Sequence, residues 1–127
     1  MRIFKTKAFN RWAKGLLTDE SLLVAVDEIS VGRFDASLGQ KVYKQRVAIA
    51  GAGRSGGART ILAFHEGDNV FFMYGFEKNE RANISKTDKE ALQKAAKVYF
   101  ALNDKKLTDE LQAGRLVEIK RKTKKKK

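Results

Sequence analysis

The stretch VAIAGAGRSGGARTILAF, residues 47–64, decides the fold. Its Gly51, Gly53 and Gly56 satisfy the spacing G-x-G-x-x-G that marks dinucleotide-binding turns. Such a turn needs a helix directly after the glycines, because the N-terminus of that helix holds the pyrophosphate. Here the run ARTILAF follows, which is rich in β-forming residues and carries no helix signal. We therefore interpret the glycine-rich segment as the connection of a β-hairpin.

The segments on both sides of these glycines have the alternation of strands. Residues 40–50 place Tyr43, Val47 and Ile49 on one face and Lys44 and Arg46 on the other. Residues 59–66 predict the next strand, and residues 70–76 are apolar on both faces, which is typical of a central strand. Short strands are also expected near the N-terminus and at residues 115–119.

Helices are expected before and after this group of strands. The first covers residues 9–14 and ends at Gly15, and the second covers 18–32, with Thr18 or Asp19 as its cap and Gly32 at its end. Residues 87–102 predict a long helix whose Thr87 and Glu90 form a capping box, and residues 108–114 a short one. One domain over residues 1–119 and a disordered basic tail over 120–127 account for the chain.

The composition excludes several classes of site and points to a polyanionic partner. There is no cysteine and one histidine, His65, so neither a thiolate site nor a multi-histidine metal centre is expected. No apolar run has the length of a membrane span or a signal peptide, which favours an intracellular protein. Lys and Arg number 27 against 15 acidic residues, and residues 36–65 contain no acid. Nucleic acid is the favoured partner, with a membrane surface as the alternative.

The basic residues of the strands are expected to converge on one side of the sheet. Lys44 and Arg46 project from the same face of their strand, and antiparallel pairing brings Arg59 near them. Arg54 lies in the glycine-rich connection, and Lys78 and Arg81 follow the central strand. A plain solvated face is the alternative interpretation. Converged guanidinium and ammonium groups hold phosphates and stabilise a pentacoordinate phosphorane, as metal-independent RNA cleavage by 2′-hydroxyl attack requires. Proton transfer then needs Lys, a carboxylate or a phenol such as Tyr74; Tyr43 and His65 are expected to be structural.

Two motifs carry a resemblance to a known family. The pattern K-x-R…G-x-G-[RK]-S-G-G-x-R-T lies at residues 44–60, and F-x-K-x-x-x-x-N-I lies at residues 76–84. With the surrounding segments, over residues 2–119, they resemble the RelE/HigB-like toxins of bacterial type II toxin–antitoxin systems, in the RelE/ParE superfamily. The resemblance implies a compact α+β fold, in which two N-terminal helices pack on a mainly antiparallel twisted sheet, followed by a C-terminal helix.

The resemblance also implies an activity and partners. Such toxins are metal- and cofactor-independent mRNA interferases that cleave mRNA in the ribosomal A site, inhibit translation and arrest growth. They act in the bacterial cytoplasm, and a cognate antitoxin blocks them; a monomeric toxin bound to a dimeric antitoxin is expected. Two alternatives stay open, a ParE-like toxin that targets DNA gyrase and a noncatalytic nucleic-acid-binding protein.

The same resemblance assigns roles to residues. The expected catalytic set is Lys44, Arg46, Arg59, Lys78, Arg81 and Tyr74, with Lys44 or Arg46 as general base and Arg59 on the scissile phosphate. The expected RNA-binding set is Lys41, Gly53, Arg54, Ser55, Lys120 and Arg121. Some relatives have a C-terminal tyrosine near the active site where this chain has Ser85, which leaves the proton donor open.

Overall fold

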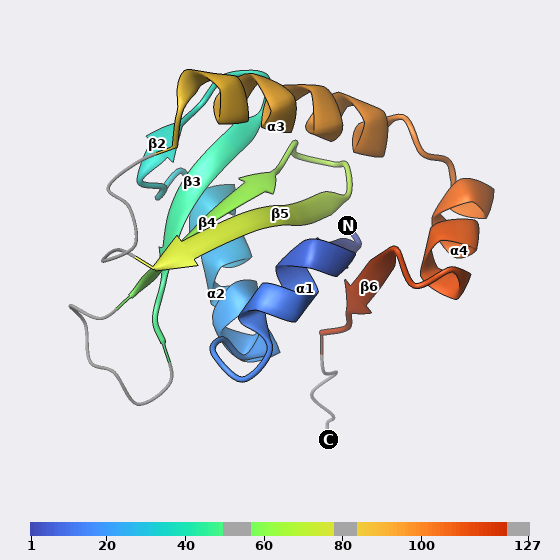
Figure 1. The fold of residues 1–127 in the computed structure, drawn as a ribbon, viewed down its shortest axis with the longest axis horizontal. Helices are drawn as coiled ribbons and strands as arrows, with labels where there is room; N and C mark the ends of the chain where they lie inside the picture. The colour runs from blue at the N-terminus through green and yellow to red at the C-terminus, as the bar shows by residue number, and fades with distance from the viewer. Residues whose placement is uncertain (50–56, 78–83, 122–127) are drawn as a thin grey trace.

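A six-stranded sheet with helices on both faces forms the molecule (Figure 1). The computed structural model describes residues 1–49, 57–77 and 84–121. The strands are β1 (Ile3–Thr6), β2 (Ala36–Ser37), β3 (Val42–Val47), β4 (Ala58–Ala63), β5 (Val70–Glu77) and β6 (Leu116–Ile119), and the helices are α1 (Lys7–Ala13), α2 (Asp19–Ser30), α3 (Lys86–Phe100) and α4 (Asp104–Gln112). The strand order is β2-β3-β4-β5-β1-β6, and every pair is antiparallel except β1 with β5. The predicted α+β class is therefore confirmed.

The strands β3 and β4 form the predicted antiparallel hairpin around the glycine-rich segment. Their register runs from Val42 opposite Ala63 to Val47 opposite Ala58. A strand, not a helix, thus follows the glycines, so the G-x-G-x-x-G spacing does not mark a dinucleotide-binding turn. The strand β3 ends at Val47, and the prediction that Ile49 continues it was wrong, because pairing with β4 stops there.

Each face of the sheet has its own apolar core. On one face α1 and α2 cover the sheet, with Phe9 and Val26 packed among residues that include Leu62 and Phe72. On the other face α3 and α4 cover a cluster that includes Phe71. Because successive strand residues point to opposite faces, β5 supplies apolar side chains to both cores, as its sequence predicted. Among the described helices, none is long and apolar enough to cross a membrane.

The helix ends follow local capping chemistry, with two departures from the sequence prediction. Thr18 caps α2 by accepting a hydrogen bond from the Ser21 amide, and Gly32 adopts a φ of 83°, both as expected. The predicted box of Thr87 and Glu90 was wrong: the Ser85 hydroxyl caps α3 by accepting a hydrogen bond from the Asp88 amide. An extended residue directly before the helix is what a cap requires, and Ser85 has that conformation. The helix α4 begins at Asp104, before the predicted residue 108, and its cap is Asn103.

Candidate functional site

Three of the expected basic residues lie on one face of the central hairpin. Arg46 on β3 and Arg59 on β4 are direct partners in the strand register, and Lys44 lies one step along, opposite Ile61. Residues that are opposite each other in neighbouring strands point to the same face, with Cβ atoms roughly 5 Å apart. The prediction that Lys44, Arg46 and Arg59 share a face is confirmed.

Tyr74 belongs to the same face, one strand further. It is the register partner of Ile61, while Phe76 is the partner of Arg59. The Tyr74 ring packs at 6.1 Å from the Phe76 ring. The other phenol considered, Tyr43, packs on the opposite face between Phe34 and Phe64, which agrees with the core role expected of it.

The side chains of Arg46 and Arg59 differ in their exposure to solvent. Arg46 is exposed, whereas the Arg59 side chain is only 14% exposed. Like charges placed directly opposite each other in a sheet repel, so this pair needs an anion close by. Asp35 provides one, because its Oδ2 lies 3.9 Å from the Arg59 Nε. The carboxylate faces the Nε side of the guanidinium, and no other carboxylate among the described residues pairs with this group, so its remaining donors can contact a ligand.

A buried glutamine holds Asp35 in this position. The Gln45 side chain, in a residue only 4% exposed, accepts a hydrogen bond from the Asp35 amide at 3.0 Å. Its amide nitrogen donates to the Arg33 carbonyl and to Glu28 Oε1 on α2, both at 3.0 Å. The Asp35 amide also donates to the Lys44 carbonyl at 3.2 Å. The segment that carries Asp35 is therefore tied to both α2 and β3.

An open hollow of about 440 Å³ lies beside this network. Its walls include Glu28, Arg33, Asp35 and Arg46, so it combines two guanidinium groups and two carboxylates. Sequence reasoning missed Asp35 and Gln45. The signal for Asp35 was available, since it is the last acid before the acid-free residues 36–65. Gln45 carried no signal, because only the register shows that it faces α2.

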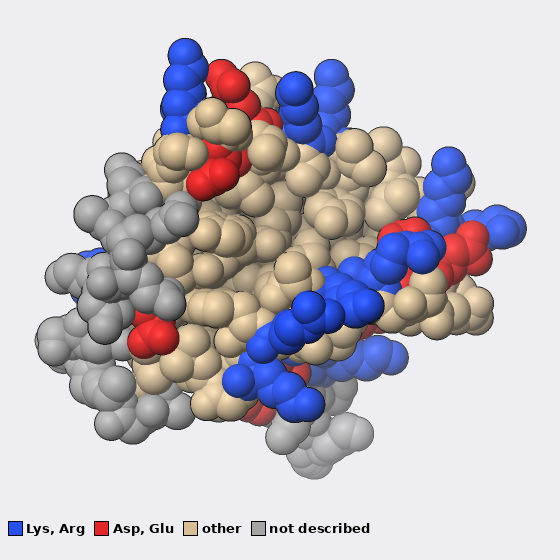
Figure 2. Space-filling view, viewed as in Figure 1, with Lys and Arg blue, Asp and Glu red and all other residues tan. Residues whose placement is uncertain are grey.

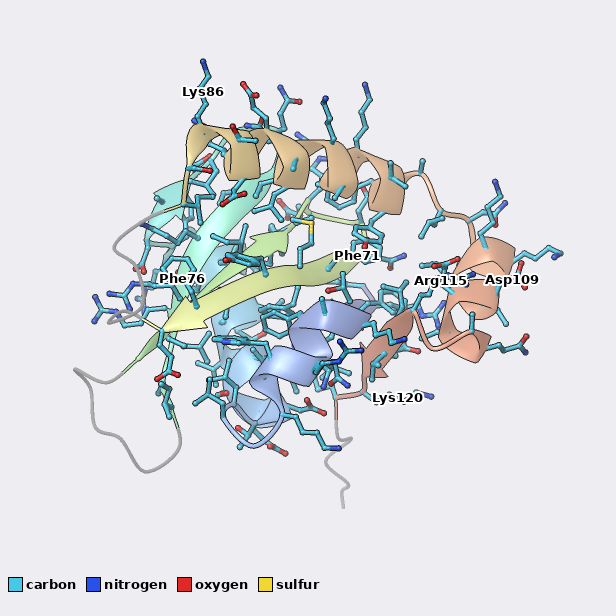
Figure 3. All side chains as sticks on the ribbon, viewed as in Figure 1. Phe71, Phe76, Lys86, Asp109, Arg115 and Lys120 are labelled. Atoms are coloured by element: carbon cyan, nitrogen blue, oxygen red, sulfur yellow. The ribbon has the colours of Figure 1, made fainter. Side chains whose placement is uncertain are left out.

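The expected RNA-binding residues that the structure describes, Lys41, Lys120 and Arg121, lie away from this site. Lys41 lies at the other end of β3 from Arg46, in a turn where its φ is 63°. Lys120 and Arg121 follow β6 at the far edge of the sheet, and Figure 3 shows Lys120 well away from Phe76, the register partner of Arg59. Arg121 forms a two-pronged contact with Asp27 of α2 at 3.1 and 3.3 Å. Gly53, Arg54, Ser55, Lys78 and Arg81 lie outside the described residues.

His65 is far from the arginines and has a partner of its own. Its Nδ1 lies 2.7 Å from Asp68 Oδ2 in the turn between β4 and β5. Arg59 lies at the opposite end of β4. Across the described part of the chain, no cluster of three His, Cys, Asp or Glu residues has metal-binding geometry.

A protein-family model covers most of the chain. Residues 1–119 match the family model described as "RelE toxin of RelE / RelB toxin-antitoxin system". The chain belongs to the RelE toxin family. A comparison with curated proteins gave no match. Membership of the RelE family confirms the resemblance seen in the sequence and makes this protein a toxin of a toxin–antitoxin system, with a cognate antitoxin as its partner.

Proposed function

We propose that this RelE-family toxin is an endoribonuclease that cleaves mRNA in the ribosomal A site without a metal ion. The observation that carries the proposal is the pairing of Arg46 and Arg59 across β3 and β4, with Lys44 beside them. Two guanidinium groups on one face suit the extra negative charge of a phosphorane. The Arg59 side chain is only 14% exposed, which reduces its screening by water and strengthens its electrostatic effect.

The proposed reaction is a transesterification within the RNA. The 2′-oxygen attacks the adjacent phosphorus, the bond from phosphorus to the 5′-oxygen breaks, and a 2′,3′-cyclic phosphate and a 5′-hydroxyl form. Lys44, in its neutral amine form, takes the proton of the 2′-hydroxyl and becomes an ammonium group, since an arginine does not give up its proton in a protein and cannot act as the base. Tyr74, on the same face, donates a proton to the leaving 5′-oxygen. Arg59 holds the phosphate and Arg46 stabilises the added charge.

The partners follow from this reaction and from the family. The substrate is mRNA on the ribosome, and the site of action is the bacterial cytoplasm. The cognate antitoxin, which we propose to be a dimer that binds monomeric toxin, blocks the face that carries Arg46 and Arg59. Lys78, Arg81 and Arg54 belong to this proposal through the family pattern alone.

A reconstituted translation reaction tests the proposed function. Primer extension maps new 5′ ends on the mRNA with and without ribosomes, and cuts in the A-site codon that need ribosomes are the expected result. Arg59→Ala and Arg59→Lys should each lower the cleavage rate, by roughly 10²- to 10³-fold if the loss resembles that of one oxyanion donor. Lys97→Ala, on the exposed side of α3, is the matched control and should cleave normally.

Three other outcomes would contradict the proposal in different ways. Cuts on free RNA would show a ribonuclease that needs no ribosome. No cuts by folded protein, together with gyrase-dependent DNA breaks in cells, would support the ParE-like alternative. RNA binding that survives in Arg59→Ala, without cleavage by the parent protein, would support a noncatalytic binding role.

A further inference from the structure

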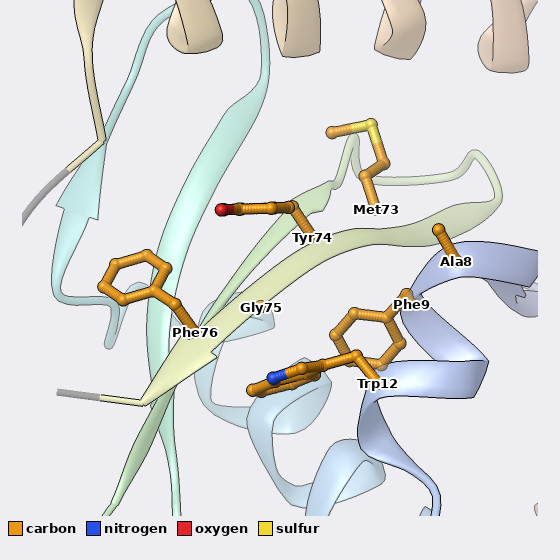
Figure 4. Close-up of a pocket in the computed structure, with 7 residues that line it drawn as sticks. All are labelled: Ala8, Phe9, Trp12, Met73, Tyr74, Gly75 and Phe76. Atoms are coloured by element: carbon orange, nitrogen blue, oxygen red, sulfur yellow. The ribbon is translucent and has the colours of Figure 1, made fainter. Parts of the chain in front are cut away.

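A cleft of about 380 Å³ lies beside the candidate site, between α1 and the C-terminal half of β5 (Figure 4). It forms because β1 pairs with β5 only over Val70–Phe72, after which the chain turns into α1 at Lys7. The helix thus takes the place of a strand along the rest of β5. Ala8, Phe9 and Trp12 line the helix side of the cleft, and residues 73–76 line the strand side.

Aromatic rings dominate the helix side of this cleft. The Trp12 ring lies against the backbone at Gly75, where a Cβ atom would collide with it. The Phe9 ring is 5.6 Å from the Trp12 ring and tilted against it by 55°. Figure 4 shows both rings below the end of β5. Trp12 is only partly buried, so the cleft offers aromatic surface to a ligand.

A row of cations runs along α1 next to the cleft. Lys7, Arg11 and Lys14 recur at intervals of four and three residues, which places them on one side of the helix, and all three are exposed. Figure 2 shows Lys and Arg side chains gathered over the position of α1, beside an uncharged surface that reaches towards β5. In the part of the chain that the structure describes, these three have no ion-pair partner, whereas Arg2 and Arg115 pair with Glu118 and Glu110.

The cleft opens at the free edge of β5, and α1 with Trp12 packs on the face of the sheet opposite the arginines. Phe76 lines the cleft and is the register partner of Arg59, so one strand spacing, roughly 4.8 Å, separates the two strands. Tyr74 likewise lines the cleft and is the partner of Ile61. A strand of RNA held at Arg59 therefore has to pass round the edge of β5, where β1 no longer pairs with it, to reach Trp12 on the other face.

We propose that this cleft binds a nucleobase of the mRNA strand next to the scissile phosphate, and that the α1 row binds the phosphates that follow. Sites for single-stranded nucleic acid combine basic side chains along the backbone with aromatic rings for the bases, and both occur here. The volume is within the range of roughly 300–1,000 Å³ common for small-ligand sites. The proposal rests on the proposed function for the identity of the RNA.

The test measures binding of RNA that cannot be cleaved. The probe is a fluorescent mRNA with a 2′-deoxy nucleotide at the attacking position, used free and on programmed ribosomes. A matched series replaces one nucleotide at a time by an abasic one. Loss of the base that fills the cleft should weaken binding roughly 5- to 150-fold, the range found for single stacked bases. Loss of bases elsewhere should matter less.

Two variants then assign that base to the cleft. Ala8→Leu fills the cleft from the exposed surface of α1, and it should weaken binding of the intact probe but not of the abasic one. Arg11→Glu should weaken both probes and reduce the salt dependence of binding. Ala113→Leu at the end of α4 and Lys94→Glu on α3 make the same changes at exposed positions away from Tyr74 and serve as controls. Thermal unfolding confirms that each variant is folded.

The outcomes separate this inference from the proposed function. If binding depends on the base and on Ala8 but the unmodified RNA is never cleaved, base binding in the cleft would be supported and the proposed nuclease function would be contradicted. If the parent protein cleaves RNA but neither Ala8→Leu nor Arg11→Glu changes RNA binding, base binding in the cleft would be refuted and the nuclease function would stand. If those variants weakened binding of the antitoxin instead, the occupant would be an acidic peptide and the inference would be wrong. A parent protein that bound neither form of the probe would contradict both.

Discussion

Arg59 and Asp35 form the closest contact between opposite charges in the candidate site, with 3.9 Å between Nε and Oδ2. The Arg59 side chain is 14% exposed and that of Asp35 is 33% exposed. A carboxylate on the Nε side restricts the rotation of the guanidinium and leaves its terminal nitrogens to face a phosphate. Asp35 is therefore placed to orient Arg59 without occupying the phosphate position.

We expect Asp35→Asn to lower the rate of mRNA cleavage while the protein stays folded. The amide has nearly the same shape as the carboxylate but no charge, so Arg59 loses the charged partner that orients it. A loss of roughly tenfold in rate would correspond to about 1.4 kcal/mol of transition-state stabilisation. Single-turnover cleavage on programmed ribosomes measures it.

Asp27→Asn is the control for this substitution, because Asp27 contacts Arg121 at the opposite edge of the sheet. It should cleave at the parent rate. The orienting role would be refuted by an Asp35→Asn protein that cleaved as fast as the parent, or by one whose loss of rate merely followed a loss of folded protein. The side-chain Nε–Hε signal of Arg59 in NMR gives a second readout, and it should shift in Asp35→Asn but not in Asp27→Asn.

Gln45→Leu should destabilise the fold and disturb the site together. Leucine fills a similar volume but leaves the Arg33 carbonyl without its bond from Gln45, and it also removes an acceptor for the Asp35 amide. An unsatisfied buried polar group costs about 1–3 kcal/mol. Urea unfolding measures the free-energy change. Gln93→Leu removes one hydrogen bond, to the Leu38 carbonyl, and should cost less. Equal losses in the two variants would argue against a special role for Gln45.

The positions in the site that could be predicted from the sequence are those set by the alternation of side chains along a strand. Lys44 and Arg46 share a face because strand side chains alternate, and Arg59 joins them because the hairpin is antiparallel. Strand alternation could not predict the position of Asp35, since the strand that follows it, β2, has only two residues and shows no alternation. Its position depends on Gln45 and Glu28, whose contact comes from tertiary packing.

The fold was predictable to a similar extent. The hairpin, the central strand and the four helices each have a local pattern in the sequence. The parallel pairing of β1 with β5 has none, because it joins residues 3–5 to residues 70–72, which are far apart in the sequence. The cleft beside Trp12 depends on where that pairing ends, which no local pattern in the sequence predicts.

Gly75→Ala tests the packing that shapes the cleft. A methyl group at residue 75 would collide with the Trp12 ring, so the ring must move or the strand must shift. Overpacking of this kind typically costs about 1–3 kcal/mol. We expect a lower unfolding free energy in urea and a change in Trp12 fluorescence, which is readable because Trp12 is the one tryptophan of the chain.

The double variant Gly75→Ala with Trp12→Leu separates collision from other effects. A smaller side chain at residue 12 makes room for the methyl group, so the two changes should cost less together than the sum of their separate costs. If the two losses of unfolding free energy simply add, the cost of Gly75→Ala would come from the backbone conformation at residue 75 and not from a collision with the Trp12 ring.

The ion pair of Arg2 and Glu118 joins β6 to the N-terminus and should make stability depend on acid pH. Arg2 donates from Nε and Nη2 to the two carboxylate oxygens of Glu118, at 3.0 Å each. The hydrogen bond from Arg2 lowers the pKa of Glu118 below its ordinary value of 4.5. A carboxyl group with a lowered pKa in the folded state stabilises the protein above its ordinary pKa, and this stabilisation disappears as the pH falls through the lowered value.

Glu118→Gln should therefore lower the unfolding free energy at pH 7, by about 1 kcal/mol for a partly exposed pair. The gap between the parent and the variant should narrow as the pH falls below 4.5, because protonation of Glu118 removes the same charge in the parent. Urea unfolding at a series of pH values measures both quantities. Asp109→Asn, which removes the exposed i,i+4 pair with Lys105, is the control and should change stability little at any pH. If the difference in unfolding free energy between the parent and Glu118→Gln stayed constant down to pH 2, the substitution would act through altered packing and not through loss of the ion pair with Arg2.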